Sequence, residues 1–352
     1  MNADHLYANC KRWVILTLLV FTTQGCSSDH LIEQTFYTFG TEVTIQINHP
    51  DKQKAQQAIY DIEQAFYQIN QDWHAWNPDS MLSHINQAIA QGQRFKVDQQ
   101  TKNFIIKNQL HSQQSDSLFD PAIGGLIALW GFQGQTNPSP PSYEQRQAWL
   151  NTRPSIKDIY FIDQEMASYN PQVKLDFGGS AKGLAMDKAG EILQGYKITH
   201  ALINIGGDIK VLGQKSNKQA WLIGLQNPKN PSEVLARIQP HDQQHVFTSG
   251  TYQRYFEWQG HRYSHIINPN TAWPADTFAS VTVIHNDAVL ADIAATALMI
   301  AGPSDWQRLS SQLNIDKVIT VDQKGNIQMT PAMSKLAELT DRKKFASSSP
   351  DK

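Results

Sequence analysis

Apolar positions recur with two different periods early in the chain. Between Phe36 and Ile47 they alternate with polar positions around Val43 and Ile45, the period of a half-buried strand. Asp51 then precedes a run of apolar residues spaced three and four apart, as on one face of a helix. That face comprises Ala55, Ala58, Ile59, Ile62, Ala65, Phe66, Ile69 and Trp73. The pattern therefore predicts a strand followed by a helix that begins after an Asp51 cap.

Shorter apolar runs farther along the chain predict more strands. We expect strands at 201–205, 221–225 and 281–284, and a β-hairpin whose arms, 252–258 and 262–267, flank Gln259-Gly260-His261. Residues 134–142, rich in Pro and Ser, predict a loop and a candidate boundary between lobes. Because strands occur in hairpins as well as between helices, an α+β fold is favoured over a doubly wound parallel sheet.

The N-terminus has the pattern of an export signal. Lys11 and Arg12 precede the apolar run 13–21, which is shorter than the roughly 20 residues that span a bilayer. The run is followed by Thr23-Gln24-Gly25-Cys26, which resembles the lipobox of bacterial lipoproteins, although Thr23 stands where Leu is usual. In such a motif the cysteine is lipidated and becomes the new N-terminus. An ordinary signal peptide and an uncleaved anchor are the alternatives.

These patterns divide the chain into four parts. We expect a signal peptide at 1–25, a lipid anchor and tether at 26–34 with Cys26 as the lipidation site, a folded domain at 35–340 and a disordered tail at 341–352. By analogy with Gram-negative lipoproteins, Ser27 favours the outer membrane. The expected location is periplasm-facing and lipid-anchored to a bacterial membrane, inner or outer.

Composition narrows the classes of function. The 352 residues are 40% hydrophobic, enough for a packed core, and 30 basic residues against 32 acidic ones leave no excess of charge for nucleic acid. Loss of residues 1–25 would remove Lys11, Arg12 and Asp4, leaving 28 basic and 31 acidic residues and a net charge of −3. Lipid is then the only evident membrane anchor. Cys10 would be lost as well, so the folded domain would contain no disulfide.

Two glycine-containing segments are candidates for contact with phosphate. Residues 176–183 (Asp-Phe-Gly-Gly-Ser-Ala-Lys-Gly) open a helical pattern, where glycines let backbone N–H groups approach an anion. The segment has neither P-loop nor dinucleotide-fingerprint spacing, so a purely structural turn is the alternative. Residues 204–208 (Asn-Ile-Gly-Gly-Asp) end an apolar strand and offer either a close ligand approach with Asp208 as acceptor or an ordinary turn.

Two further segments carry groups suited to catalysis. His265 is expected in a strand just before the turn at Asn268-Pro269, where imidazole could act as a general base; a structural histidine is the alternative. Asp292 and Thr296 are four apart on a predicted helix and share one face. A carboxylate and a hydroxyl suit Mg²⁺, unless Thr296 bonds back to its own helix.

Other catalytic arrangements are not found. His241 and His245 are four apart in a polar stretch and are expected at the surface. No zinc-protease His-Glu-x-x-His motif and no Gly-x-Ser-x-Gly elbow occur, so metalloprotease and serine-hydrolase functions are not supported.

Taken in order, these segments resemble the ApbE family of FAD:protein FMN transferases, over roughly residues 35–325. The resemblance is carried by 119–126 with Leu129-Trp130-Gly131-Phe132, and by 176–183 with Asp187. It continues through 201–208, 248–252, 263–269 and 291–298, with a looser match at 76–86. It implies a T-fold-related arrangement of antiparallel sheets flanked by helices. It also implies transfer of FMN from FAD to a Thr or Ser hydroxyl with release of AMP, Mg²⁺ being held at the FAD pyrophosphate.

The resemblance also implies roles for individual residues. Asp292, Thr296 and the carbonyl of Ala181 map to the metal ligands, and His265 maps to the histidine proposed to deprotonate the acceptor. Trp76 would stack on adenine. The remaining flavin- or phosphate-lining positions are Asp120, Gly178, Gly179, Lys182, Asp187, Asp208, Ser249 and Gly250. Asn268, Asn270 and Trp273 depart from residues common in the family without removing a metal ligand or the histidine.

The implied partners are FAD and the flavin-bearing subunits of Na⁺-translocating NADH:quinone reductase, Rnf or similar redox proteins, with no nucleic acid. Two alternatives use the same site. One is an FAD pyrophosphatase that yields FMN and AMP, and the other is a flavin-binding lipoprotein without catalysis. A solute-binding lipoprotein would need a two-lobed Rossmann-like pattern, which the sequence lacks.

Overall fold

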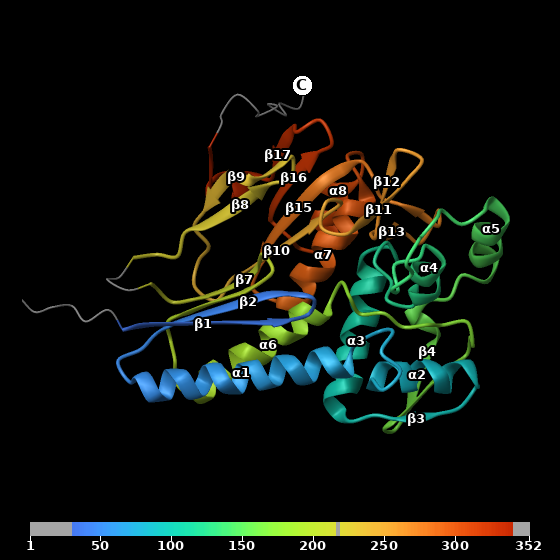
Figure 1. The fold of residues 1–352 in the computed structure, drawn as a ribbon, viewed down its shortest axis with the longest axis horizontal. Helices are drawn as coiled ribbons and strands as arrows, with labels where there is room; N and C mark the ends of the chain where they lie inside the picture. The colour runs from blue at the N-terminus through green and yellow to red at the C-terminus, as the bar shows by residue number, and fades with distance from the viewer. Residues whose placement is uncertain (1–29, 216–218, 341–352) are drawn as a thin grey trace, which may run out of the picture.

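An eight-stranded antiparallel sheet forms the centre of the computed structural model, which describes residues 30–215 and 219–340 (Figure 1). Its strand order is β1-β2-β6-β7-β10-β15-β16-β17, and every neighbouring pair is antiparallel. The bounds are β1 Leu31–Thr38, β2 Thr41–Asn48, β6 Ala201–Ile205, β7 Asp208–Leu212, β10 His245–Gly250, β15 Phe278–His285, β16 Lys317–Asp322 and β17 Ile327–Met329. With helices packed against this sheet, the predicted α+β class is confirmed.

The single strand predicted between residues 36 and 47 is instead a hairpin. Phe39 and Gly40 form its two-residue turn, with φ of 54° and 72°, and Thr38 pairs with Thr41 across it. The alternation around Val43 marked only β2. Because β1 is half exposed, its polar residues gave no strand signal, and residues 31–34, expected in the tether, belong to β1.

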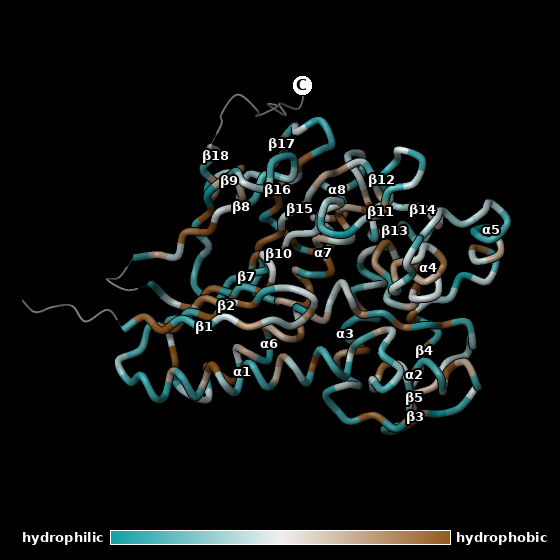
Figure 2. The backbone as a smooth tube through the Cα atoms, in the orientation of Figure 1, coloured by the Kyte–Doolittle hydropathy of each residue, from teal (hydrophilic) through white to brown (hydrophobic). Residues whose placement is uncertain are grey.

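Helices cover one face of the sheet. These are α1 (Lys52–Asp72), α6 (Ala181–Gly195), α7 (Ala288–Ala301) and α8 (Trp306–Gln312). The Asp51 cap is confirmed, because its carboxylate accepts a hydrogen bond from Lys54 N at 3.0 Å. Figure 2 shows α1 hydrophilic over most of its length with hydrophobic residues at intervals, as expected of a helix with one buried face. Helix α7 is buried almost all round.

A small three-stranded sheet covers part of the opposite face. It consists of β8 (Ile223–Asn227), β9 (Asn230–Ile238) and β18 (Ala337–Leu339), with α9 (Pro331–Ser334) leading into β18. Its buried side chains, including Trp221 and Ile238, pack with Val211, Val246 and Ile319 of the main sheet. The central strands are therefore buried on both faces, whereas β1 contributes only the partly buried Leu31 to this second core.

A helical lobe packs beside the main sheet. Its elements are α2 (Met81–Ala90), β3 (Phe95–Lys96), α3 (Gln99–Gln114), α4 (Gly124–Leu129), α5 (Tyr143–Thr152), the 3-10 turn Ile156–Asp158, β4 (Ile159–Ile162) and β5 (Glu165–Ser168). The predicted loop at 134–142 joins α4 to α5. Two short hairpins complete this side, β11 (Tyr255–Trp258) with β12 (His261–Ser264), and β13 (Ile267–Asn268) with β14 (Trp273–Pro274).

Most of the predicted strands are confirmed. β6 occupies 201–205 as expected, β15 extends the strand predicted at 281–284, and β11 and β12 form the predicted hairpin with shorter arms. In residues 30–215 and 219–340, no helix combines the length and apolar character that a membrane span requires. The predicted signal peptide, Cys26 and the tail at 341–352 lie outside the described residues.

Candidate active site

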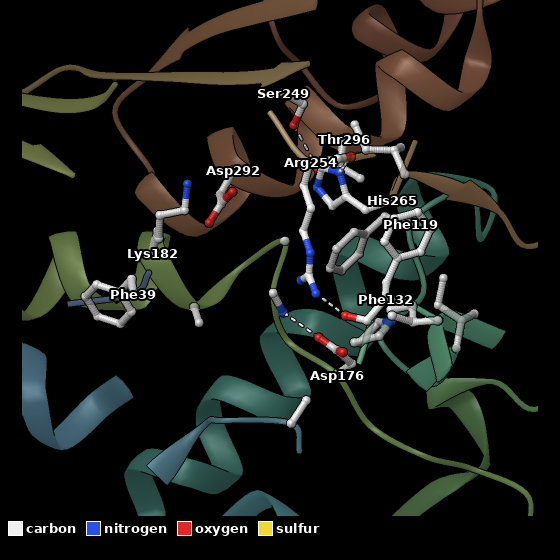
Figure 3. Close-up of a pocket in the computed structure, with 18 of the residues that line it drawn as sticks. Phe39, Phe119, Phe132, Asp176, Lys182, Ser249, Arg254, His265, Asp292 and Thr296 are labelled. Atoms are coloured by element: carbon white, nitrogen blue, oxygen red, sulfur yellow. Dashed lines mark hydrogen bonds between the residues drawn. The ribbon is translucent and has the colours of Figure 1, made fainter. Parts of the chain in front are cut away.

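One cavity of about 620 Å³ brings most of the predicted site residues together (Figure 3). It lies among the β1–β2 turn, the end of α1, the start of α6, β10, α7 and the segment between β12 and β13. The predicted residues that line it are Trp76, Asp120, Gly178, Gly179, Ala181, Lys182, Asp208, Ser249, His265, Asp292 and Thr296. Segments far apart in sequence therefore form a single site.

Asp187 and Gly250, predicted at the site, do not line the cavity. Asp187 is five residues beyond Lys182 on α6, and this spacing turns its side chain to a different face of the helix. There its carboxylate lies 3.5 Å from the ammonium of Lys107. Gly250 ends β10, where a Cβ would lie 2.5 Å from the ring of Tyr252, so a larger residue would require this ring to move.

A close crossing of α6 and α7 forms the centre of the site. At Gly183 a Cβ would lie 2.6 Å from Val289 Cα and 2.8 Å from Ala288 O, so only glycine allows the two helices to approach this closely. The Gly183 N–H donates to Asp292 Oδ2 at 3.0 Å. The first turn of α6 thus holds the carboxylate of Asp292, where the positive end of a helix favours an anion.

Asp292 and Asp208 form a charged group with Lys182. The Lys182 ammonium forms an ion pair with Asp208 Oδ2, and Asp208 Oδ1 accepts from Thr248 N at 3.0 Å. Burial, together with the neighbouring Asp208 carboxylate, raises the pKa of Asp292 to about 7. Burial opposes the charge on Lys182, but the Asp208 and Asp292 carboxylates outweigh it and raise the pKa of the ammonium.

Thr296 faces the same cavity one turn after Asp292. Its hydroxyl lies 3.0 Å from the Ser249 hydroxyl, so the alternative bond to the Asp292 carbonyl is not the one formed. A Cβ on Gly179 would lie 3.4 Å from Thr296 Oγ1, which places the loop before α6 directly against this hydroxyl. Ala181, whose carbonyl is the third expected ligand, begins α6 beside that loop.

These residues fit a magnesium ion. Mg²⁺ is usually held by one or two carboxylates, with water and substrate phosphates completing its octahedron. Across the described parts of the chain, no cluster of three or more His, Cys, Asp or Glu side chains could hold a metal, so a Zn²⁺-type cage is not present there. The lining carries the carboxylates of Asp120, Asp176, Asp208 and Asp292 against the cations of Lys182 and Arg254. A divalent cation would offset this acidic excess and make the cavity suitable for an anionic cofactor.

His265 lies in the bend between β12 and β13 rather than in a strand. Its Nδ1 is 3.0 Å from the carbonyl oxygen of Arg254, which also accepts the His265 backbone N–H at 3.1 Å. A carbonyl only accepts, so Nδ1 carries the proton and Nε2 keeps its lone pair. Burial lowers the pKa of the imidazole to about 4, which makes the ring neutral at pH 7. The geometry therefore suits a proton acceptor at Nε2.

An aromatic group lines another part of the cavity. The ring of Trp76 is 41% exposed, and the guanidinium of Arg254 lies 5.2 Å from its centroid. Arg254 also donates to the carbonyl of Phe132 and is in no ion pair with the described carboxylates. The sequence placed Asp176 and Phe132 in candidate motifs but gave neither residue a role, and it assigned none to Arg254, whose carbonyl pairs with His265. An exposed indole in this cavity can accept a stacked base.

Two predicted binding groups are engaged within the protein. Asp120 accepts hydrogen bonds from Ala122 N at 2.9 Å, Ile156 N at 2.9 Å and Ser155 Oγ at 2.7 Å. Its carboxylate therefore connects two segments of the helical lobe that are distant in sequence. Gly178 N donates to Asp176 Oδ1 at 2.9 Å.

The segment at 204–208 serves two purposes. Gly206 and Gly207 have φ of 59° and 99° and form the tight turn between β6 and β7. They do not line the cavity, so the turn interpretation holds for the glycines. Asp208, the first residue of β7, does line it.

Comparison with known proteins gives a consistent result. The model of the ApbE family matches residues 39–319. A Rhodobacter capsulatus protein named FAD:protein FMN transferase is 36% identical over 304 residues, which are 86% of this chain and 57% of that protein. A Vibrio cholerae protein of the same name is 28% identical over 299 residues, 83% of this chain and 88% of that protein. This chain thus spans little more than half of the first relative.

Solved structures agree with this similarity. The ApbE protein of Thermotoga maritima superposes with a TM-score of 0.80 at 29% identity, covering 87% of this chain and 99% of that one. The flavin transferase ApbE from Vibrio cholerae gives a TM-score of 0.76 at 25% identity, with the same coverage of both chains. The chain belongs to the ApbE family.

Proposed function

We propose that this chain is a Mg²⁺-dependent FAD:protein FMN transferase, which moves FMN from FAD to a Thr or Ser hydroxyl of a partner protein and releases AMP. The observation that carries the proposal is the convergence of His265, Asp292 and Thr296 on one cavity beside the start of α6. Relatives named FAD:protein FMN transferase support the same activity.

Each residue of the cavity has a separate role in the proposed reaction. The acceptor hydroxyl attacks the FMN phosphorus of FAD, a P–O bond to the acceptor forms, and the P–O bond to AMP breaks. His265 Nε2 takes the hydroxyl proton, because Nδ1 is committed to the Arg254 carbonyl. Lys182 and the first turn of α6 would hold the pyrophosphate, because both line the cavity and favour an anion. Mg²⁺ held by Asp292, Thr296 and the Ala181 carbonyl would stabilise charge on the phosphates.

The transfer assay uses the full chain in detergent, FAD, Mg²⁺ and an acceptor domain with a Ser/Thr flavinylation motif. Covalent flavin fluorescence of the acceptor supports the transferase. FMN and AMP without labelling would indicate the pyrophosphatase instead, and unchanged bound FAD would indicate a carrier.

Two variants test the assigned roles. Asp292→Asn keeps an oxygen for the Gly183 N–H but removes the charge, so Mn²⁺ binding measured by electron paramagnetic resonance should weaken by more than tenfold and labelling should be lost. Asp187→Asn on α6 is the matched control and should retain both. His265→Asn keeps a donor for the Arg254 carbonyl but lacks Nε2, so labelling should fall about 10²- to 10⁴-fold while Mn²⁺ binding persists. Normal labelling by either site variant would contradict its role.

The same proposal includes attachment to a membrane on its periplasmic side. Cys26 would carry the lipid, and the acceptors would be subunits of Na⁺-translocating NADH:quinone reductase, Rnf or similar redox proteins. The net charge of −3 after loss of residues 1–25 supports lipid rather than electrostatic binding. Cys26→Ser should abolish incorporation of labelled palmitate and release the protein from membranes; retention of the label would overturn the assignment.

A further inference from the structure

The two cationic side chains that line the cavity differ in how their charge is compensated. Lys182 forms an ion pair with Asp208. Arg254 is exposed and forms no ion pair with any carboxylate of residues 30–215 and 219–340. From its position we infer that Arg254 is a catalytic residue, whose guanidinium binds the FMN phosphate of FAD and stabilises the negative charge that develops there during transfer. This inference rests on the proposed FMN transfer.

Arg254 lies directly opposite His265 on the β11–β12 hairpin. The strand pairing ends at Tyr255 with Ser264, and at the next position the His265 N–H donates to the Arg254 carbonyl at 3.1 Å. Residues opposite each other on antiparallel strands send their side chains to the same face. Both side chains line the cavity (Figure 3). The general base and the guanidinium therefore enter the cavity from neighbouring positions.

The guanidinium of Arg254 contacts neutral groups. Its Nη2 donates to the carbonyl of Phe132, which is the one hydrogen-bond acceptor of this side chain in the described parts of the chain. The guanidinium lies 5.2 Å from the ring centroid of Trp76 and 5.9 Å from that of Phe132. A guanidinium has five N–H donors, and its bonds to phosphate are roughly twice as strong as bonds between neutral groups. A phosphate can therefore bind the guanidinium in place of the carbonyl or together with it.

Asp176 faces the same cavity but leaves Arg254 available to a ligand. The Asp176 carboxylate raises the pKa of Arg254, but burial lowers this pKa by more. Asp176 Oδ1 accepts the Gly178 N–H at 2.9 Å, and burial raises the pKa of the Asp176 carboxyl. Arginine keeps its charge at any physiological pH, so a phosphate would meet a full positive charge here.

The position of His265 determines which phosphate Arg254 would contact. The attacked phosphorus must lie next to the acceptor oxygen, and that oxygen must lie next to His265 Nε2 to lose its proton. As the P–O bond to the acceptor forms and the P–O bond to AMP breaks, charge spreads over the other oxygens of this phosphorus. His265 takes the proton and AMP keeps the electron pair of the broken bond. Arg254 stabilises the charge, as arginines do in other phosphoryl-transfer enzymes, where they contribute about 10³- to 10⁵-fold in rate.

Arg254→Met separates phosphate binding from a structural role. Methionine keeps an apolar stem beside Trp76 and Phe132, and the backbone carbonyl that holds His265 is unchanged. FMN and riboflavin differ only by the phosphate, and their affinities are measured by flavin fluorescence in EDTA. The wild type should bind FMN about 10- to 100-fold more tightly than riboflavin, and Arg254→Met should lose most of this preference at unchanged riboflavin affinity. A purely structural Arg254 would weaken the binding of both flavins equally, and that result would overturn the inference.

The transfer assay then measures the catalytic contribution. Labelling of the acceptor domain by Arg254→Met should fall about 10³-fold, and Arg254→Lys should recover only part of it, because an ammonium lacks the planar donor fork. Arg262→Met on the same hairpin, where Arg262 pairs with Glu257 at 2.8 Å, is the matched control and should retain the FMN preference and the labelling.

The outcomes distinguish this inference from the proposed function. Normal labelling by Arg254→Met, or an unchanged FMN preference in this variant, would overturn the inference and leave the proposed transfer standing. Absence of labelling by the wild type, together with an FMN preference that depends on Arg254, would overturn the transfer and support the phosphate contact.

Discussion

A buried lysine–histidine pair makes a definite prediction about stability and pH. Lys210 of β7 and His245 of β10 are directly paired, with Nζ 2.8 Å from Nε2, and they are 9% and 2% exposed. The sequence interpretation of His245 as a surface residue is wrong, because β10 begins there. Nε2 accepts from the ammonium, and Nδ1 has no hydrogen-bond partner in the described part of the chain.

The surroundings of this pair keep His245 neutral. Burial, followed by the Lys210 charge, lowers the pKa of His245 to about 3 from 6.5. The carbonyls of His285 and Asn286 and the carboxylate of Asp287 act in the opposite direction but are outweighed. Below pH 6.5 His245 is protonated in the unfolded chain but stays neutral in the folded chain, so the free energy of unfolding falls as the pH drops. The loss continues until pH approaches 3.

The size of the loss of stability follows from the width of the pH interval over which it is measured. Each pH unit corresponds to about 1.4 kcal/mol, so from pH 6.5 to pH 5 the histidine should remove about 2 kcal/mol of stability. His245→Gln keeps an acceptor for Lys210 but does not titrate. Urea unfolding at a series of pH values should show the difference between variant and wild type shifting by about 2 kcal/mol in favour of the variant over this interval. Parallel pH profiles, or an NMR titration of His245 near pH 6.5, would refute the reasoning.

Three further predictions concern packing and binding. Gly183→Ala should lower the free energy of unfolding by about 1–3 kcal/mol, measured by chemical denaturation, because the added methyl group would meet the backbone of α7. Gly195→Ala is the control, and it should be neutral or slightly stabilising because the space around Gly195 is open. Equal effects of the two substitutions would contradict the close crossing of α6 and α7. Asp187→Asn should leave the KM for FAD within twofold, and a tenfold increase would place Asp187 in the site after all. Trp76→Leu should weaken FAD binding about five- to tenfold by fluorescence titration with normal Mn²⁺ binding, and unchanged affinity would remove the stacking role.

The elements that could be predicted from sequence are those with one buried face or a local signal. α1 has a clear helical period and a capping aspartate, and β6 has a short apolar run of the right length. β1 gave no such signal, because an exposed edge strand has few apolar positions. The small sheet of β8, β9 and β18 could not be assembled from sequence, since its strands join a core only after residues about 100 positions apart meet.

The site was predictable where several reactive groups lie in one short segment. Asp292 and Thr296 share a helix face, and helix geometry alone brings them together. Asp187 belongs to the same motif as Lys182 but lies on another face of the helix and does not line the cavity. Arg254 was missed because its role depends on contacts with Trp76 and Phe132, which come from distant parts of the chain.

The crossing of α6 and α7 explains why two sequence signals describe one site. Read as separate motifs, the glycine segment at 176–183 predicts phosphate contact and the pair Asp292–Thr296 predicts a metal. Only the resemblance to the ApbE family implies that the two segments meet. Gly183 joins them across 109 positions, because its missing side chain lets the helices touch and its N–H then holds the Asp292 carboxylate. A helix start that favours an anion and a carboxylate that favours a cation thus face the same space. The proposed complex of Mg²⁺ with the FAD pyrophosphate would need that arrangement, and neither segment could supply it alone.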